Sequence, residues 1–241
     1  MTRGYDDSFF RLGAIGAALY LGAQLFQAVA FWWLPVATAP GEAIALRQLP
    51  LDQIRNLVVL LGFVPLLVAY TAAALTGARR FTGSAILAIT FTSLFVALEI
   101  GYRSIDLFGV SLQWASEYTA SPDAAARAAV IDRIHHWEQI VVAWYFGLLL
   151  THGAASICLA WVVRRSDAPA TAVVSLLFAL NALRILARML EMHAGVHGLA
   201  PLNAVAYFPM VVVLYGTLTY WLLKQRGSAD QAPVLPGTRP A

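Results

Sequence analysis

Charged side chains recur at helical spacing inside stretches of the chain that are otherwise apolar. Glu99, Arg103 and Asp106 follow one another at i, i+4 and i+7, which places all three on one face of a helix. A charge near the middle of a membrane costs about 2.5–3.5 kcal/mol on insertion scales, so such residues mark ion pairs, ligand sites or catalytic groups. Glu99 is the candidate general acid or base among them.

A second apolar stretch carries a matching polar face with Asn181, Arg184 and Arg188. Counting about 1.5 Å per residue from the arginine-rich helix ends puts Glu99 and Arg184 at one depth, roughly 8–9 Å below the outer boundary. We therefore expect Glu99 and Arg184 to form an ion pair. The candidate ligand-binding residues of this layer are Tyr145, Arg184, Tyr207, Arg103, Arg188, Glu138 and Asn181.

The histidines are weak candidates for a metal site. His193 and His197 lie four residues apart, a spacing that presents two nitrogens to one metal on a helix, and His135 belongs to the same face of the membrane. Gly195 and Gly198 interrupt the helix there, and a neighbouring catalytic carboxylate at motif spacing is absent. The sequence therefore predicts neither a metal nor another cofactor.

The composition is that of a membrane protein. Of the 241 residues, 60% are hydrophobic and only 12% are charged, against roughly 25% charged residues in a typical soluble domain. This small number of charges cannot cover a surface that faces water. Much of the chain must therefore face lipid. The formal net charge of +3 is too dispersed to indicate a nucleic-acid partner.

Six apolar stretches are long enough to span a bilayer as helices, which takes about 20 residues. They are continuous rather than alternating, which favours an all-α bundle over a β-barrel. The expected spans are 10–34, 54–76, 82–107, 134–163, 170–192 and 202–224. We expect one transmembrane domain over 1–226 and a disordered tail over 227–241, which is rich in Gly, Pro and Ala.

The segment before the fourth span has helix-start signals of its own. Ser121 suits an N-cap, Pro122 the first helical position, and Asp123 complements the helix dipole. We expect 122–136 to extend the fourth helix into or above the outer interface.

The first span contains Arg11-Leu12-Gly13-Ala14-Ile15-Gly16-Ala17-Ala18-Leu19-Tyr20-Leu21. With the loop pattern of the whole chain, it resembles a family of uncharacterised bacterial six-helix integral membrane proteins with a domain of unknown function. The resemblance implies the same architecture and a bacterial inner membrane, and it implies no activity. Membrane-embedded cyclases and isomerases of isoprenoid metabolism also place acids near one leaflet, which is an analogy only.

Three functions are compatible with the polar layer. The first is a polar, charged pocket in the outer-leaflet half of the bundle that binds or acts on a small amphiphile, such as a lipid or isoprenoid. The second is a structural or accessory membrane subunit whose buried charges only pair helices. The third is a small transporter, which is disfavoured because the polar residues do not continue through the inner half.

Basic residues outside the spans report the orientation. One side of the membrane holds Arg3, Arg11, Arg79, Arg80, Arg164, Arg165, Lys224, Arg226 and Arg239. The other side holds Arg47, Arg55, Arg127 and Arg133. Positive loops and tails stay in the cytoplasm, so both termini are predicted to be cytoplasmic.

This orientation predicts that a reporter active only in the cytoplasm gives signal when it is fused to the C-terminus. A matched fusion in the segment 35–49 should be silent with that reporter and active with a periplasmic one. The reverse pattern would contradict the orientation.

Overall fold

The computed structural model describes residues 7–78, 80–164, 166 and 168–225. Within this part of the chain the regular elements are helices, and six of them are long and apolar enough to cross a membrane. The prediction of an all-α, polytopic bundle of six transmembrane helices is confirmed. The boundary expected at 226 and the tail 227–241 lie outside the described residues, as do Arg79 and Arg165.

Each predicted span corresponds to one long helix, except that the third, 82–107, runs past the end of its helix at Ser104 into a π-helical continuation. These helices are α1 (Asp7–Trp33), α3 (Pro50–Thr76), α4 (Thr82–Ser104), α6 (Ala124–Val163), α7 (Thr171–His193) and α8 (Ala200–Leu223). Shorter elements join them: α2 (Pro40–Leu46), the π-helical η1 (Ile105–Trp114), α5 (Ala115–Ala120) and the 3-10 turn η2 (His197–Leu199). The sequence did not predict α2, nor that the third span continues helically through η1 and α5.

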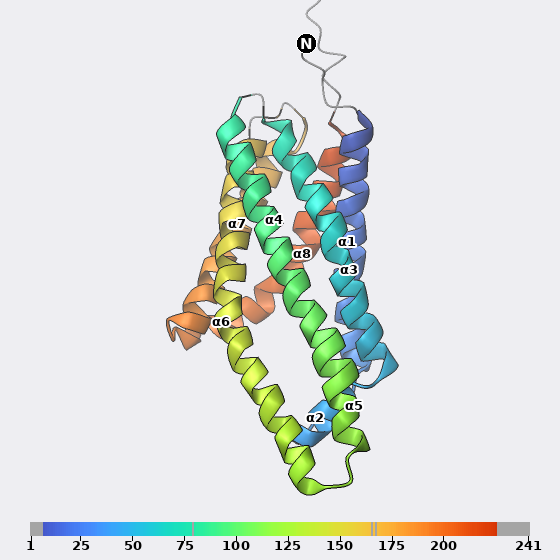
Figure 1. Cartoon of the computed structure of the whole chain (residues 1–241). Coiled ribbons are helices and arrows are strands. Elements are labelled where there is room, and N and C mark those ends of the chain that lie inside the picture. The colour runs from blue at the N-terminus through green and yellow to red at the C-terminus, as the bar shows by residue number, and fades with distance from the viewer. Residues whose placement is uncertain (1–6, 79, 165, 167, 226–241) are drawn as a thin grey trace, which may run out of the picture.

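The six long helices form a closed ring in chain order. Neighbours along the chain pack together as α1·α3, α3·α4, α4·α6, α6·α7 and α7·α8, and α8 packs against α1 to close the ring. Figure 1 shows α1 beginning and α8 ending at the same end of the bundle. We call this the inner end and the opposite one, which carries α2 and α5, the outer end, after the predicted orientation.

Close packing of α1 on α3 anchors the ring. A Cβ added to Gly16 would lie 2.4 Å from the backbone oxygen of Pro65, so no larger residue fits without moving a helix. The buried core of the bundle contains aromatic side chains among aliphatic ones, and within it the hydroxyls of Tyr70 and Tyr215 form a 2.8 Å hydrogen bond with each other. Because both hydroxyls are paired, the core carries no polar penalty at this point.

At the outer end two helical arms extend past the turn between α7 and α8 (Figure 1). One arm is α4 continued by η1 and α5, and the other is the first half of α6, so the predicted extension over 122–136 is present. The N-cap of α6 is Asp123, whose carboxylate accepts from Ala125 N and Ala126 N at 3.2 Å; the predicted cap, Ser121, is wrong. A second small core holds the arms together, formed by Ile44, Val110, Ala115, Val130, Ile134 and Trp137.

The packing predicts opposite effects for two alanine substitutions on α1. Gly16→Ala should lower the free energy of unfolding by about 1–3 kcal/mol, because its methyl group overpacks the contact with Pro65. Gly22→Ala is the matched control, since nothing lies within 4 Å of its added Cβ, and it should be neutral or stabilising by up to about 1 kcal/mol. Thermal unfolding of both variants in one detergent checks this; equal stabilities would contradict the close approach.

Candidate ligand-binding site at the outer end

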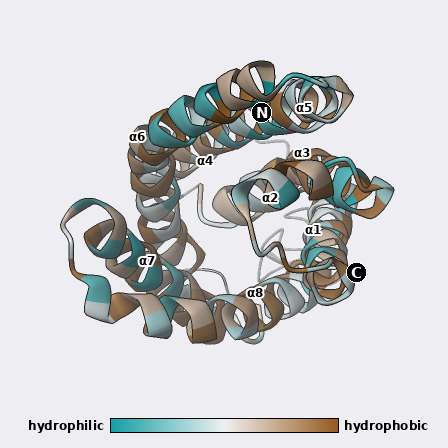
Figure 2. Ribbon diagram, turned by 90° about the horizontal axis from the view of Figure 1, so that it is seen from below, coloured by the Kyte–Doolittle hydropathy of each residue, from teal (hydrophilic) through white to brown (hydrophobic). Residues whose placement is uncertain are grey.

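The short helix α2 lies within the outline of the ring when the bundle is seen from its outer end (Figure 2). Pro40 occupies its first turn, and Thr38 donates its backbone N–H and its hydroxyl to Glu42 Oε2, both at 2.8 Å. These bonds hold the pKa of Glu42 below its usual value. After α2, Gln48 donates to Ser116 Oγ at 2.9 Å, which ties the segment to α5.

Beneath this segment lies a partly open polar pocket of about 360 Å³, which we call the outer pocket. Its lining comes from α1, the α2–α3 segment, α3, α4, η1 and α6. The lining residues are Gln27, Phe31, Arg47, Asp52, Arg55, Asn56, Tyr102, Arg103, Asp106 and Tyr145. Of the predicted ligand-binding residues, the outer pocket thus contains Arg103 and Tyr145.

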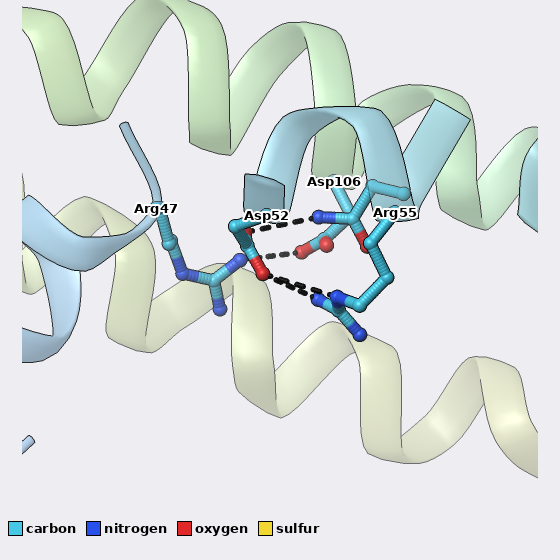
Figure 3. Close-up of polar contacts among 5 residues, drawn as sticks. Arg47, Asp52, Arg55 and Asp106 are labelled. Carbon is cyan, nitrogen blue, oxygen red and sulfur yellow. Dashed lines mark hydrogen bonds and ion pairs between the residues drawn. The ribbon is translucent and has the colours of Figure 1, made fainter. Parts of the chain in front are cut away.

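Two ion pairs form one wall of the outer pocket (Figure 3). Arg47 Nη1 donates to Asp106 Oδ1 at 3.0 Å and so links the end of α2 to η1. Asp52 is 7% exposed and accepts from Arg55 Nη2 at 2.7 Å and from Asn56 Nδ2 at 3.2 Å. Asp52, Arg55 and Asn56 lie one turn apart on α3, so helical spacing alone brings these three together.

Deeper in the bundle, Arg103 connects the outer pocket to the buried Glu99. Arg103 Nε donates to Glu99 Oε2 at 3.1 Å, and its guanidinium carbon lies 5.4 Å from the ring centroid of Tyr102. Glu99 is only 7% exposed and does not line the outer pocket. Its carboxylate therefore serves as the counter-charge that allows Arg103 to lie at this depth.

Arg184 belongs to a neighbouring group of polar side chains from α1, α6, α7 and α8. Its guanidinium donates to Asn181 Oδ1 at 3.2 and 3.3 Å and lies 5.2 Å from the ring centroid of Tyr207. Tyr207 donates its hydroxyl to Gln24 at 2.9 Å, and Asn181 donates to Ser156 at 3.0 Å. Asn181, Arg184 and Tyr207 are thus brought together, as predicted, although not around the outer pocket.

The predicted ion pair between Glu99 and Arg184 is wrong. Glu99 pairs with Arg103 one turn away on its own helix, and among the described residues no carboxylate lies within ion-pairing distance of Arg184. The sequence placed Glu99 and Arg184 at the same height in the bundle. It did not show how each helix is rotated about its own axis, which decides the direction of each side chain. An acid at i and an arginine at i+4 already face each other, so Arg103 reaches Glu99 without any help from tertiary packing.

The remaining predicted site residues lie elsewhere. Arg188 pairs with Glu191 on α7, and Asn203 donates to Glu191 at 2.7 Å. Glu138 lies on the exposed arm of α6 beside His135, with 3.8 Å between His135 Nδ1 and a carboxylate oxygen.

His193 contacts Phe146 edge to face at the end of α7, with 5.4 Å between ring centroids, and His197 begins the turn η2. The described part of the chain brings no three His, Cys, Asp or Glu residues together in a group that could hold a metal ion.

Sequence reasoning missed Asp52 and Asn56 and counted Arg47 only as a loop charge. A signal was present: Pro50 is a helix-start residue, and Asp52, Arg55 and Asn56 follow it at i, i+3 and i+4. The pairing of Arg47 with Asp106, 59 residues apart in the chain, had no such local signal.

No protein-family model, curated protein or solved structure matches this chain, so the geometry of the site carries the functional argument alone.

The observed pairing predicts unequal effects of two arginine substitutions. Arg103→Gln should lower the free energy of unfolding by about 3–5 kcal/mol, because it leaves the buried carboxylate of Glu99 without its ion-pair partner. Arg184→Gln should cost clearly less, because no described carboxylate loses its partner. In a double-mutant cycle, measured by unfolding in one detergent, Glu99→Gln should couple to Arg103→Gln and not to Arg184→Gln. A larger coupling with Arg184 would overturn the pairing.

Proposed function

We propose that the protein binds a small amphiphile, such as a lipid or isoprenoid, at the outer end of the bundle. The observation that carries this proposal is a second pocket, of about 230 Å³, that adjoins the outer pocket. Phe31, Arg47 and Asp52 line both pockets. A polar pocket and an apolar one that share a wall suit a ligand with a polar head and an apolar tail.

The second pocket, which we call the apolar pocket, suits the tail. Besides the three shared residues it is lined by Leu34, Pro35, Val36, Ala43 and Leu46. Directly before it, Trp32 and Trp33 at the end of α1 are 89% and 78% exposed. Exposed tryptophans at a helix end are typical of the membrane–water interface, so a tail could reach this pocket from the outer leaflet.

The outer pocket suits an anionic head group, such as a phosphate or carboxylate. Each guanidinium carries several N–H donors in a fork that matches such an anion. The described carboxylates take one or two donors from each of Arg47, Arg55 and Arg103. Donors remain on all three arginines, and they surround one pocket.

The same geometry favours binding over catalysis. A general acid or base must come within hydrogen-bond reach of the group that reacts. Glu99, the candidate acid or base, does not line the outer pocket, and Arg103 occupies one of its oxygens. Glu99 holds Arg103 in place at the wall of the outer pocket through one hydrogen bond.

A structural role for the same charges is the second candidate, and the Arg47–Asp106 pair favours it because it joins two elements. Around the outer pocket, however, the pairs Arg55–Asp52 and Arg103–Glu99 each lie within one helix. A pair within one helix cannot hold two helices together. A structural role therefore accounts for only some of the charged residues around the outer pocket.

We further propose that the protein lies in a bacterial inner membrane, within the six-helix family that its first helix resembles. The support is the sequence of that helix, the six spans and the side bias of basic residues.

Two matched probes test the proposal on the purified protein in detergent: lauroyl lysophosphatidic acid and monolauroyl glycerol, which share a chain and differ in the phosphate. The phosphate probe should bind at least about tenfold more tightly, because a charge-assisted hydrogen bond contributes about 1.5–3 kcal/mol. Arg47→Gln should remove most of this preference. Ala43→Phe should weaken both probes, since it fills the apolar pocket.

Arg127→Gln is the matched control for Arg47→Gln, because Arg127 is an exposed arginine of the outer end that lines neither pocket. Equal binding of the two probes, or equal effects of the two arginine substitutions, would refute the anionic head group. The double substitution Arg47→Gln with Asp106→Asn separates the two candidate functions. A structural role predicts lower stability with unchanged binding of the phosphate probe. The proposed function predicts unchanged stability with weaker binding of that probe.

A further inference from the structure

The opposite end of the bundle carries a groove between α6 and α7 that the proposed function does not use. It has a volume of about 290 Å³, and we call it the inner groove. Its lining residues are Ile157, Ala160, Trp161, Arg164, Ser175, Ala179 and Ala182. From Ser175 to Ala182 it follows α7 for about 10 Å, so it runs along the helices from the inner end toward the membrane centre.

The inner groove faces lipid rather than the bundle interior. Ile157 and Trp161 are 62% and 47% exposed, and Ala179 is exposed as well. Ser175, the polar residue along its floor, donates its hydroxyl to the backbone oxygen of Ala160 at 2.7 Å. Because this hydroxyl is satisfied within the protein, the floor presents an apolar surface.

A positive charge closes the inner groove at the membrane edge. Arg164 follows the last residue of α6, and its guanidinium carbon lies 3.2 Å from the ring centroid of Trp161. In the described part of the chain no carboxylate pairs with Arg164. The groove thus combines an apolar channel parallel to the helices with a charge, at head-group level, that no described carboxylate pairs with.

We propose that the inner groove binds one anionic phospholipid of the cytoplasmic leaflet. Its acyl chain lies between α6 and α7, where small side chains leave room, and its phosphate contacts Arg164. The indole of Trp161 holds the guanidinium at the mouth of the groove and marks the head-group level. The complementarity of charge selects an anionic lipid over a zwitterionic one of the same chain length.

Native mass spectrometry of the full chain, released from nanodiscs with equal parts of phosphatidylglycerol and phosphatidylcholine of identical chains, tests this proposal. The unmodified protein should retain phosphatidylglycerol preferentially. Arg164→Gln should reduce that preference about fivefold, since one basic residue near an anionic lipid surface contributes about 1 kcal/mol. Arg164→Lys should keep the preference, because it keeps the charge. Ala179→Phe should reduce retention of both lipids by filling the groove.

Two controls make the test specific. Arg11→Gln removes an exposed arginine of the same membrane end outside the groove, and Leu176→Phe adds bulk to an exposed position of α7 outside it. Both should retain phosphatidylglycerol as the unmodified protein does. The proposal is overturned if the unmodified protein shows no preference, or if Arg164→Gln and Arg11→Gln, or Ala179→Phe and Leu176→Phe, behave alike. None of these outcomes bears on the outer pocket, which lies at the other end.

Discussion

The lack of water in the hydrocarbon core is the constraint on which the rest of this structure depends. Backbone groups must find their partners within the chain, and the described regular elements meet this demand as helices. Charged side chains face the same demand, and the outer half of the bundle meets it mostly at short range. Arg55, Arg103 and Arg188 each pair with an acid three or four residues away on the same helix.

Pairing within a helix has a consequence for function. It gives each arginine a counter-charge without linking it to a neighbouring helix, so the helices at the outer end can lie apart around a pocket. The pair between Arg47 and Asp106 differs, because it joins the end of α2 to η1 in the wall of that pocket. This ion pair therefore lowers the free-energy cost of burying the two charges. It also positions the segment around α2, which lies over the outer pocket.

The two ends of the bundle solve different packing problems. Toward the inner end, α1 and α3 approach so closely that a single added methyl group at Gly16 would meet backbone, and aromatic side chains fill the interior. Toward the outer end, the ring opens around polar side chains, and the small core of α2, η1, α5 and α6 holds the extended arms together. The tightly packed inner end thus stabilises the bundle, and the outer end can hold the proposed binding site.

The sequence by itself determined the class of the fold, the number of spans and the height of each polar residue along its own helix, because apolar length and a rise of about 1.5 Å per residue suffice for these. It also contained the pairs within single helices, although Asp52 and Asn56 were overlooked. Only the tertiary structure decided which polar residues share a pocket. It placed Arg103 and Tyr145 in one pocket lining with Arg47 and left Arg184 out of that lining, although depth alone had grouped them. The physical reason is that backbone hydrogen bonds set the rise along a helix, whereas its rotation and its neighbours follow from packing across the whole ring.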